Sequence, residues 1–170
     1  MNAGAQWDFR APEFASKLKA TWNYRGECSG DPSAQAGFGV SNLIELTPGT
    51  GYEIRKGAPM HRFNNFGSPV TVSYFKRIAA EYREAFPTAA NLVVLGVSLP
   101  WGGLYDVDSS WAPPYSDHRF GFELDLAADS VPVANRPRFR AIAAESQVGV
   151  EEFGDWILLT FPPFSPAPGE

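Results

Sequence analysis

The sequence predicts an α+β domain with a mainly antiparallel sheet and flanking helices. Three segments in the C-terminal two-thirds of the chain carry this prediction: an amphipathic helical stretch, a strictly alternating strand stretch, and a two-residue turn between apolar runs. Helices and hairpins grouped in this way are typical of α+β folds. The 170 residues include 16 Gly and 15 Pro, which argues against a bundle of long helices.

Composition narrows the classes of protein to consider. A hydrophobic fraction of 44%, with 5 Trp, 6 Tyr and 13 Phe, is typical of a chain with a packed core. The single cysteine, Cys28, excludes an internal disulfide framework. The net charge of −5 argues against a duplex nucleic acid partner, and no apolar run approaches the roughly 18 residues of a membrane helix. We therefore expect neither a nucleic acid partner nor a membrane span.

The N-terminal part, residues 1–40, is expected to be an extension that is partly loop. Ala11–Ala20 has a proline near its start and apolar residues four apart, which predicts a short helix. Gly26–Gly39 is rich in Gly, Ser and Ala and predicts a loop. Two short strands are expected next, Asn42–Leu46 and Tyr52–Arg55, joined by a turn rich in Pro and Gly.

The clearest helix is predicted over Pro69–Phe86. Ser68 is a suitable N-cap, Pro69 fits the first helical position, and Pro87 ends the segment. Apolar residues recur at three- and four-residue spacing and form one core-facing stripe, which comprises Phe75, Ile78, Ala79, Tyr82 and Phe86. The apolar run Leu92–Leu99 is predicted to be a strand, followed by a long ordered surface loop over residues 104–117.

The C-terminal segments complete the predicted sheet. Along Phe120–Leu126 the residues alternate strictly, so we expect Phe120, Phe122, Leu124 and Leu126 to point one way and Gly121, Glu123 and Asp125 the other. A second helix is predicted over Arg136–Gln147, with Asn135 as its cap. The strands Val148–Phe153 and Trp156–Phe161 flank the turn Gly154-Asp155.

His118 and Asp125 are the pair of residues whose types and spacing suit a metal site. The chain has two histidines, His61 and His118, and His118 is followed by Gly121 and then by Asp125 on the polar face of the predicted strand. A neutral imidazole nitrogen and a carboxylate oxygen both bind zinc at about 2.0–2.2 Å, and a glycine between them leaves room for a substrate backbone. A purely structural interpretation fits the same residues, with His118 and Arg119 binding loop carbonyls and Asp125 accepting local hydrogen bonds. The spacing leaves both interpretations open.

The surrounding pattern resembles a known family. Ser116-x-His118-x-x-Gly121-x-x-x-Asp125 is preceded by a Ser98–Asp106 segment and by Trp111-x-Pro113-Pro114. Together these are similar to the zinc D-alanyl-D-alanine peptidases, a family that includes penicillin-insensitive murein endopeptidases and shares its fold with the hedgehog signalling domain. The resemblance runs from about His61 to Phe161. It implies a hedgehog-type domain over residues 41–161, followed by a Pro-rich tail over residues 162–170.

The resemblance also implies roles for individual residues. His118 and Asp125 would be two zinc ligands, Asp155 would stand in the place of the general base, and Arg119 would bind a substrate carboxylate. The third zinc ligand of the family is a histidine, and Leu158 stands at its position, while Tyr115 stands where many relatives carry another histidine. Substrate contacts would come from four residues, Ser116, Tyr115, Trp111 and Trp101. A nearby acid (Glu123, Glu151, Glu152 or Asp155) or His61 could replace the missing ligand.

The resemblance leaves two functions open. In the first, the domain has an impaired or lost zinc site, and it either binds a cell-wall peptide or another small peptide, or serves a structural role. The alternative is an active zinc-dependent D-alanyl peptidase or murein endopeptidase with a non-standard third ligand. The resemblance suggests the cell envelope or the extracellular space, and neighbouring domains in a longer protein, although Met1–Gly4 lacks the basic and apolar regions of a signal peptide.

Overall fold

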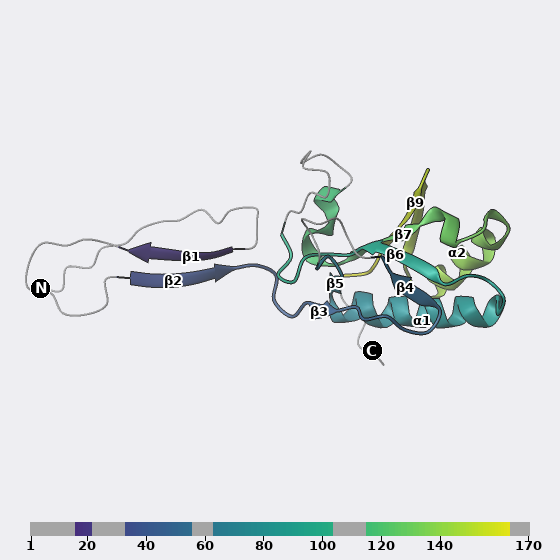
Figure 1. Ribbon diagram of the computed structural model, residues 1–170, viewed down its shortest axis with the longest axis horizontal. Helices are drawn as coiled ribbons and strands as arrows, with labels where there is room; N and C mark the ends of the chain where they lie inside the picture. Colours follow the sequence, from purple (N-terminus) through teal and green to yellow (C-terminus); the bar gives the residue numbers. More distant parts are fainter. Residues whose placement is uncertain (1–15, 22–32, 56–62, 104–114, 164–170) are drawn as a thin grey trace, which may run out of the picture.

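The structure is a computed structural model that describes residues 16–21, 33–55, 63–103 and 115–163 (Figure 1). Two α-helices, nine strands and three short 3₁₀ helices lie within these residues. The strands are β1 (Ser16–Thr21), β2 (Ser33–Phe38), β3 (Ile44–Glu45), β4 (Tyr52–Ile54), β5 (Phe66–Gly67), β6 (Leu92–Gly96), β7 (Glu123–Ala127), β8 (Gly149–Phe153) and β9 (Trp156–Thr160). The helices are α1 (Pro69–Ala85), α2 (Arg136–Glu145), η1 (Tyr115–Phe120), η2 (Ala128–Ser130) and η3 (Val133–Asn135).

The central sheet has five strands in the order β4-β6-β7-β9-β8. β4 and β6 are parallel and are connected through α1, whereas the pairs β6–β7, β7–β9 and β9–β8 are antiparallel. β3 and β5 form a small antiparallel pair beside this sheet. The α+β class with a mainly antiparallel sheet is therefore confirmed.

The core lies between the two α-helices and one face of the central sheet. Leu124 and Leu126 of β7 and Ile157 and Leu159 of β9 are fully buried in it. The aromatic rings of α1 and α2 meet there, with the Tyr82 and Phe139 centroids 5.7 Å apart. Helix α1 runs along the sheet and α2 lies at one end (Figure 1).

Helix α1 matches its prediction closely. It begins at Pro69, and the Ser68 side chain accepts a hydrogen bond from the Thr71 N–H, as expected of an N-cap. The predicted stripe faces the core, with Phe75, Ile78 and Ala79 fully buried. Phe86 is the C-cap and is half-buried against the core.

Strand β6 is shorter than the predicted Leu92–Leu99. Its pairing with β7 becomes irregular between Val94 and Gly96, and the chain then leaves the sheet. The backbone of Val97 and Ser98 instead bonds to the segment before α1: the Val97 N–H donates to the Asn64 carbonyl, and the Phe66 N–H donates to the Ser98 carbonyl.

The predicted alternation through Phe120–Leu126 holds only from Glu123 onward. Leu124 and Leu126 are buried, but Phe120 lies in η1 with 57% of its surface exposed, so the prediction that it shares a strand face with them is wrong. Gly121 has a φ of +69°, which breaks the extended backbone between η1 and β7. A strand cannot continue through this left-handed residue, so the period-two pattern does not reach Phe120.

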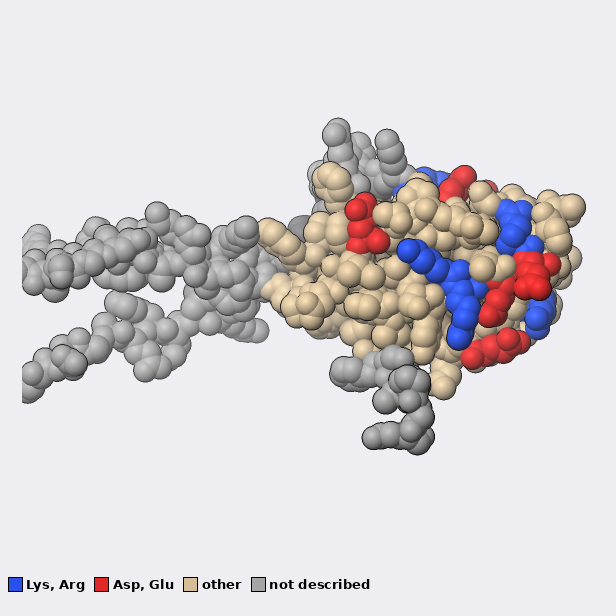
Figure 2. Space-filling model, turned by 90° about the horizontal axis from the view of Figure 1, so that it is seen from below, with Lys and Arg blue, Asp and Glu red and all other residues tan. Residues whose placement is uncertain are grey.

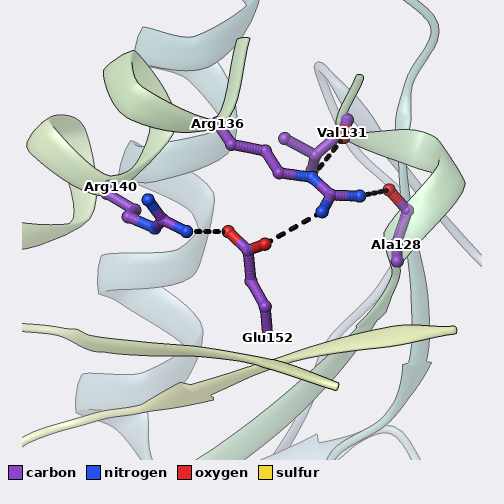
Figure 3. Close-up of polar contacts among 5 residues, drawn as sticks. All are labelled: Ala128, Val131, Arg136, Arg140 and Glu152. Atoms are coloured by element: carbon purple, nitrogen blue, oxygen red, sulfur yellow. Dashed lines mark hydrogen bonds and ion pairs between the residues drawn. The ribbon is translucent and has the colours of Figure 1, made fainter. Parts of the chain in front are cut away.

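Helix α2 begins at the predicted Arg136 with Asn135 at its N-cap position, but the Asn135 side chain makes no capping hydrogen bond. The 3₁₀ turn η3 runs directly into the helix, so Asn135 already has a helical backbone, and its side-chain amide donates to the Tyr82 hydroxyl. The start of α2 is held by Arg136, which donates to the Val131 and Ala128 carbonyls and pairs with Glu152 of β8 at 2.9 Å (Figure 3). Arg140 binds the second oxygen of the same carboxylate.

The C-terminal hairpin is confirmed. Phe153 and Trp156 pair directly across the Gly154-Asp155 turn, and their rings stack with centroids 5.3 Å apart. β9 continues between β8 and β7, so the hairpin forms one side of the central sheet. Residues 164–170 of the expected Pro-rich tail lie outside the described residues.

The N-terminal predictions are wrong where the structure describes the chain. Residues 16–20 of the predicted helix lie in β1, and residues 33–38 of the predicted loop lie in β2, which pairs with β1 in antiparallel register over six residues. Inter-strand hydrogen bonding thus overrides a helical pattern that rested on one apolar pair. The two expected strands after residue 40 exist as β3 and β4, but they belong to different sheets.

Among the described residues, no helix is long and apolar enough to cross a membrane. We refer below to β1 and β2 as the N-terminal ribbon and to the described residues from 39 onward as the body.

Gly121 provides a test of the η1–β7 junction. A Cβ on Gly121 would lie 2.8 Å from the Leu43 side chain and 3.1 Å from the backbone of Gly67 and Ser68, in addition to the strain of its φ. We expect Gly121→Ala to lower the free energy of unfolding by at least about 1 kcal/mol in a urea titration. Gly149→Ala is the matched control, because the nearest atom is 3.6 Å away and the backbone is ordinary. Equal stability of the two variants would contradict this view of the junction.

Candidate functional site

The candidate site is a buried contact between η1 and β7. His118 is in the last turn of η1 with 1% of its surface exposed, and Asp125 is in the middle of β7 with 5% exposed. His118 Nε2 lies 3.0 Å from Asp125 Oδ2, and His118 Nδ1 lies 2.5 Å from the Val97 carbonyl oxygen. The predicted convergence of His118 and Asp125 on one place is therefore present in the structure.

The two contacts of His118 set its protonation. The Val97 carbonyl can only accept, so Nδ1 must carry a proton. A neutral imidazole would then present a lone pair from Nε2 toward the Asp125 carboxylate, which is also an acceptor. The contact at 3.0 Å is favourable when Nε2 carries a proton as well, so the arrangement is that of an imidazolium bound to a carboxylate.

The electrostatics agree with this assignment. Burial of the imidazole lowers its pKa, but three other influences outweigh burial: the hydrogen bond to Asp125, the charges of Asp125 and Glu123, and the Val97 carbonyl. The net result is a His118 pKa above its ordinary value.

Leu158 lies directly beside this pair. In the register of β7 and β9, Asp125 is opposite Leu158, so the two side chains project from the same face of the sheet. On the far side of β9, Leu158 is opposite Glu151 of β8. Strands are about 4.8 Å apart, so Glu151 stands two strand spacings from Asp125. Leu158 is half-buried and Glu151 is exposed.

The described residues do not fit a catalytic zinc centre. Such a centre needs three protein ligands and an open position for water. No group of three His, Cys, Asp or Glu side chains that could hold a metal occurs among residues 16–21, 33–55, 63–103 and 115–163. Leu158, which lies opposite Asp125 in β9, has no lone pair to offer a metal. His61, the other histidine, lies outside the described residues.

The remaining predicted site residues come from several segments of the chain. Asp155 is exposed in the β8–β9 turn, three residues along the strand from Leu158, which is roughly 10 Å. Trp101 is 49% exposed, and its carbonyl accepts from the Val40 N–H. Arg119 is half-buried beside His118, and its carbonyl accepts from the Gly103 N–H. Tyr115 and Ser116 lie in the first turn of η1, and Trp111 lies outside the described residues.

Gly121 has a different role from the one predicted. The expected close approach is present, but the approaching atoms are those of Leu43, Gly67 and Ser68 rather than a substrate. The Ser68 N–H also donates to the Gly121 carbonyl. Gly121 therefore serves to pack the η1–β7 junction against the start of α1.

One participant could not be found from the sequence. The Val97 carbonyl binds the His118 ring, but a backbone acceptor has no signature in the sequence. The next residue, Ser98, is fully buried, and its hydroxyl has no hydrogen-bond partner in the structure.

Comparison of the sequence with models of known protein families and with curated proteins finds no match.

The raised pKa of His118 gives the stability of the protein a specific pH dependence. Because the folded-state pKa lies above the unfolded value of about 6.5, protonation of the imidazole favours the folded state. This contribution is fully present below about pH 6.5 and is lost as the pH rises through the folded-state pKa. We expect the unfolding free energy to fall over that interval in urea titrations at successive pH values.

Asp125→Asn is the variant that tests the origin of this dependence. The amide removes the charge that raises the His118 pKa, so the fall in stability above about pH 6.5 should disappear. At lower pH the variant should be about 2 kcal/mol less stable, because a charged hydrogen bond is lost. Asp129→Asn, at an exposed aspartate, is the control and should retain the wild-type pH profile. An unchanged profile in Asp125→Asn would contradict the assigned ion pair.

Proposed function

We propose that residues 41–161 form a domain of the zinc D-alanyl-D-alanine peptidase type that has lost its catalytic metal centre and acts as a peptide-binding or structural module. The ligand that the resemblance implies is a cell-wall peptide or another small peptide. The observation that carries the proposal is the position of Leu158, which lies opposite Asp125 beside the His118–Asp125 pair.

The chemistry of the site favours binding over hydrolysis. Hydrolysis by this family depends on a metal-bound water, and a metal needs lone pairs from its ligands. In this chain His118 Nε2 and Asp125 Oδ2 are directed at each other, and the third position is aliphatic. A metal held by His118 and Asp125 would therefore lack a third donor at the position of Leu158.

Residues around the pair retain features suited to a peptide ligand. Trp101 and Phe120 both expose about half of their surface close to η1. Aromatic side chains with one exposed side bind peptides through apolar contact while excluding water. Arg119 lies between Phe120 and His118 in the sequence and supplies a positive charge of the kind that binds a peptide carboxylate.

The second candidate is an active zinc peptidase with a non-standard third ligand. Its support is Glu123, which lies two residues before Asp125 in β7 and whose charge contributes to the raised His118 pKa. In this case Glu123 would have to bind the same metal as His118 and Asp125. A measurement of zinc content separates the two candidates.

Zinc affinity tests the proposal through a single substitution. We expect the wild-type chain, purified without chelator, to bind no stoichiometric zinc. Leu158→His adds an imidazole beside Asp125 and should raise the zinc affinity by at least about 100-fold, because each ligand is worth several kcal/mol. Zinc binding is measured by competition with a chromophoric chelator.

Two further variants control for side effects of the substitution. Leu158→Gln introduces polarity without a strong ligand, and Leu158→His combined with Asp125→Asn removes one of the original donors. Neither should gain the affinity of Leu158→His. Stoichiometric zinc in the wild-type chain would support the active peptidase instead. No gain in Leu158→His would show that Leu158 does not occupy a former ligand position.

Peptide binding tests the other half of the proposal. We expect a peptide ending in D-Ala-D-Ala to change the tryptophan fluorescence of the wild-type chain with a saturable dependence on concentration. Trp101→Ala should weaken this binding, since the exposed indole is lost. The same peptide ending in L-Ala-L-Ala is the control. Equal binding of both peptides, or none of either, would rule out a specific cell-wall-peptide site and leave the structural role.

A further inference from the structure

Strand β8 is an edge of the central sheet. The strand order is β4-β6-β7-β9-β8, so β8 pairs with β9 on one side and with no other described strand on the opposite side. Four of its five residues are exposed, and the fifth, Val150, is half-buried. The strand contains no proline, and its register with β9 is regular. An edge of this kind presents unpaired N–H and C=O groups to any extended chain that reaches it.

The hairpin geometry identifies the backbone groups that are open. Phe153 and Trp156 flank the two-residue turn, and such a turn closes on two residues that hydrogen-bond to each other. Hydrogen-bonded and non-hydrogen-bonded pairs alternate along antiparallel strands. The N–H and C=O groups of Val150 and Glu152 therefore point away from β9. No backbone hydrogen bond from another described segment reaches either residue.

The side chain of Glu152 is held by α2. Arg136 binds its carboxylate at 2.9 Å, and Arg140 binds the other oxygen (Figure 3). The Glu152 side chain is 25% exposed, yet the residue as a whole is exposed, so its main chain supplies much of that exposure. The two ion pairs thus fix β8 against α2 while the backbone at the edge stays open.

Glu151 gives the open edge a negative charge. It is exposed, and within the described part of the chain no lysine, arginine or histidine forms an ion pair with it. Successive side chains of a strand point to opposite faces, so Glu151 lies on the face away from Glu152 and its two arginines. A strand added to the edge places one side chain directly opposite Glu151, where an opposite charge is favourable. A lysine or arginine at that position complements the edge.

Other charged groups on the surface are neutralised by their neighbours. Arg77 of α1 pairs with Glu81, and Arg138 of α2 pairs with Glu145. On the face seen in Figure 2, basic and acidic side chains likewise lie intermixed at one end of the body. Such mixed surfaces provide little charge for recruiting a partner, whereas Glu151 lies beside open backbone groups.

The same charge disfavours a second copy of this chain on the edge. Two copies of β8 that pair through all of their open groups place one Glu151 directly opposite the other, and like charges in this position are destabilising. A register shifted toward Val148 needs an N–H that already donates to the Ala143 carbonyl. A shift in the other direction brings Gly154 of the turn into the pairing. A foreign strand with a basic residue meets none of these obstacles.

We propose that the β8 edge binds an extended segment of another protein, which adds as an antiparallel strand and places a lysine or arginine opposite Glu151. Addition of a strand to an exposed edge is a general mode of peptide recognition, in which main-chain hydrogen bonds supply affinity and side chains supply specificity. Four backbone hydrogen bonds form in this arrangement, two with Val150 and two with Glu152.

Phe153 adds a second preference on the same face of the edge as Glu151. Its ring is 38% exposed and stacks on Trp156, so the neighbouring side chain of the added strand is best aromatic or apolar. This surface is made by β8 and does not include the His118–Asp125 pair. The inference therefore does not depend on the proposed function of that site.

Amide hydrogen exchange followed by NMR tests the proposal residue by residue. The probe is a capped peptide, Thr-Tyr-Val-Lys-Val-Thr-Thr, whose lysine faces Glu151 in the antiparallel register. We expect saturating peptide to slow exchange of the Val150 and Glu152 N–H groups by at least about tenfold. Exchange at Glu151 and Phe153 should change little, because their N–H groups already bond to β9.

Two altered peptides separate strand addition from simple charge attraction. Methylation of both valine nitrogens removes the donors that the added strand needs, so protection of Val150 and Glu152 should disappear. Replacement of the lysine by glutamate should raise the Kd by at least about fivefold, because cross-strand attraction becomes repulsion. Equal protection by the methylated and unmethylated peptides would overturn the proposal.

Charge exchange on the protein provides the matched variants. Glu151→Lys should bind the glutamate peptide more tightly than the lysine peptide, the reverse of the wild-type preference. Glu53→Lys makes the same change at an exposed glutamate of β4, the opposite edge strand, and should keep the wild-type preference. No protection of Val150 and Glu152 by the lysine peptide at millimolar excess would overturn the proposal. Protection of these amides by self-association without peptide would also overturn it and assign the edge to a second copy.

Discussion

A buried imidazole with an oxygen atom at each of its nitrogens is the constraint on which the site depends. His118 sits between the Val97 carbonyl and the Asp125 carboxylate, and both contacts are satisfied only when the ring carries two protons. Placing a charged pair in the interior costs desolvation energy, which the direct hydrogen bonds and the charge of Asp125 must offset. The pair therefore behaves as a single unit that is lost if either partner is changed.

This unit joins three parts of the chain that are far apart in sequence. Val97 follows β6, His118 ends η1, and Asp125 lies in β7. The left-handed Gly121 makes the connection possible, because it turns the chain between η1 and β7 while leaving space for Leu43 and the start of α1. Leu158 then closes the side of Asp125 that faces β9. The geometry holds the acid and the base together, and within the described part of the chain no third His, Cys, Asp or Glu groups with them to hold a metal.

Much of the fold could be predicted because its signals are local. The cap, proline and apolar stripe of α1 lie within one segment, and the β8–β9 hairpin is specified by its two turn residues and the apolar runs beside them. The ribbon could not be predicted, since β1 and β2 are defined by pairing with each other across eleven intervening residues rather than by a strong pattern. Phe120 fits the alternation of apolar and polar residues that predicts a strand, but the left-handed backbone of Gly121 ends the extended conformation before it reaches Phe120.

The candidate site was predictable in part for the same reason. His118 and Asp125 are near in sequence, and the strand period places Asp125 on the polar face, so their convergence follows from local geometry. The Val97 carbonyl and the turn at Gly121 depend on the packing of distant segments, and neither leaves a distinctive residue type behind.

The protonation state of His118 tests the central claim most directly. Nitrogen-15 spectra of the imidazole rings at neutral pH distinguish a ring with one proton from a ring with two, and a His118→Gln variant separates its signals from those of His61. The account predicts that Nδ1 and Nε2 of His118 both carry protons and that added zinc leaves their shifts unchanged. An Nε2 without a proton, or one whose shift moves on addition of stoichiometric zinc, would contradict it.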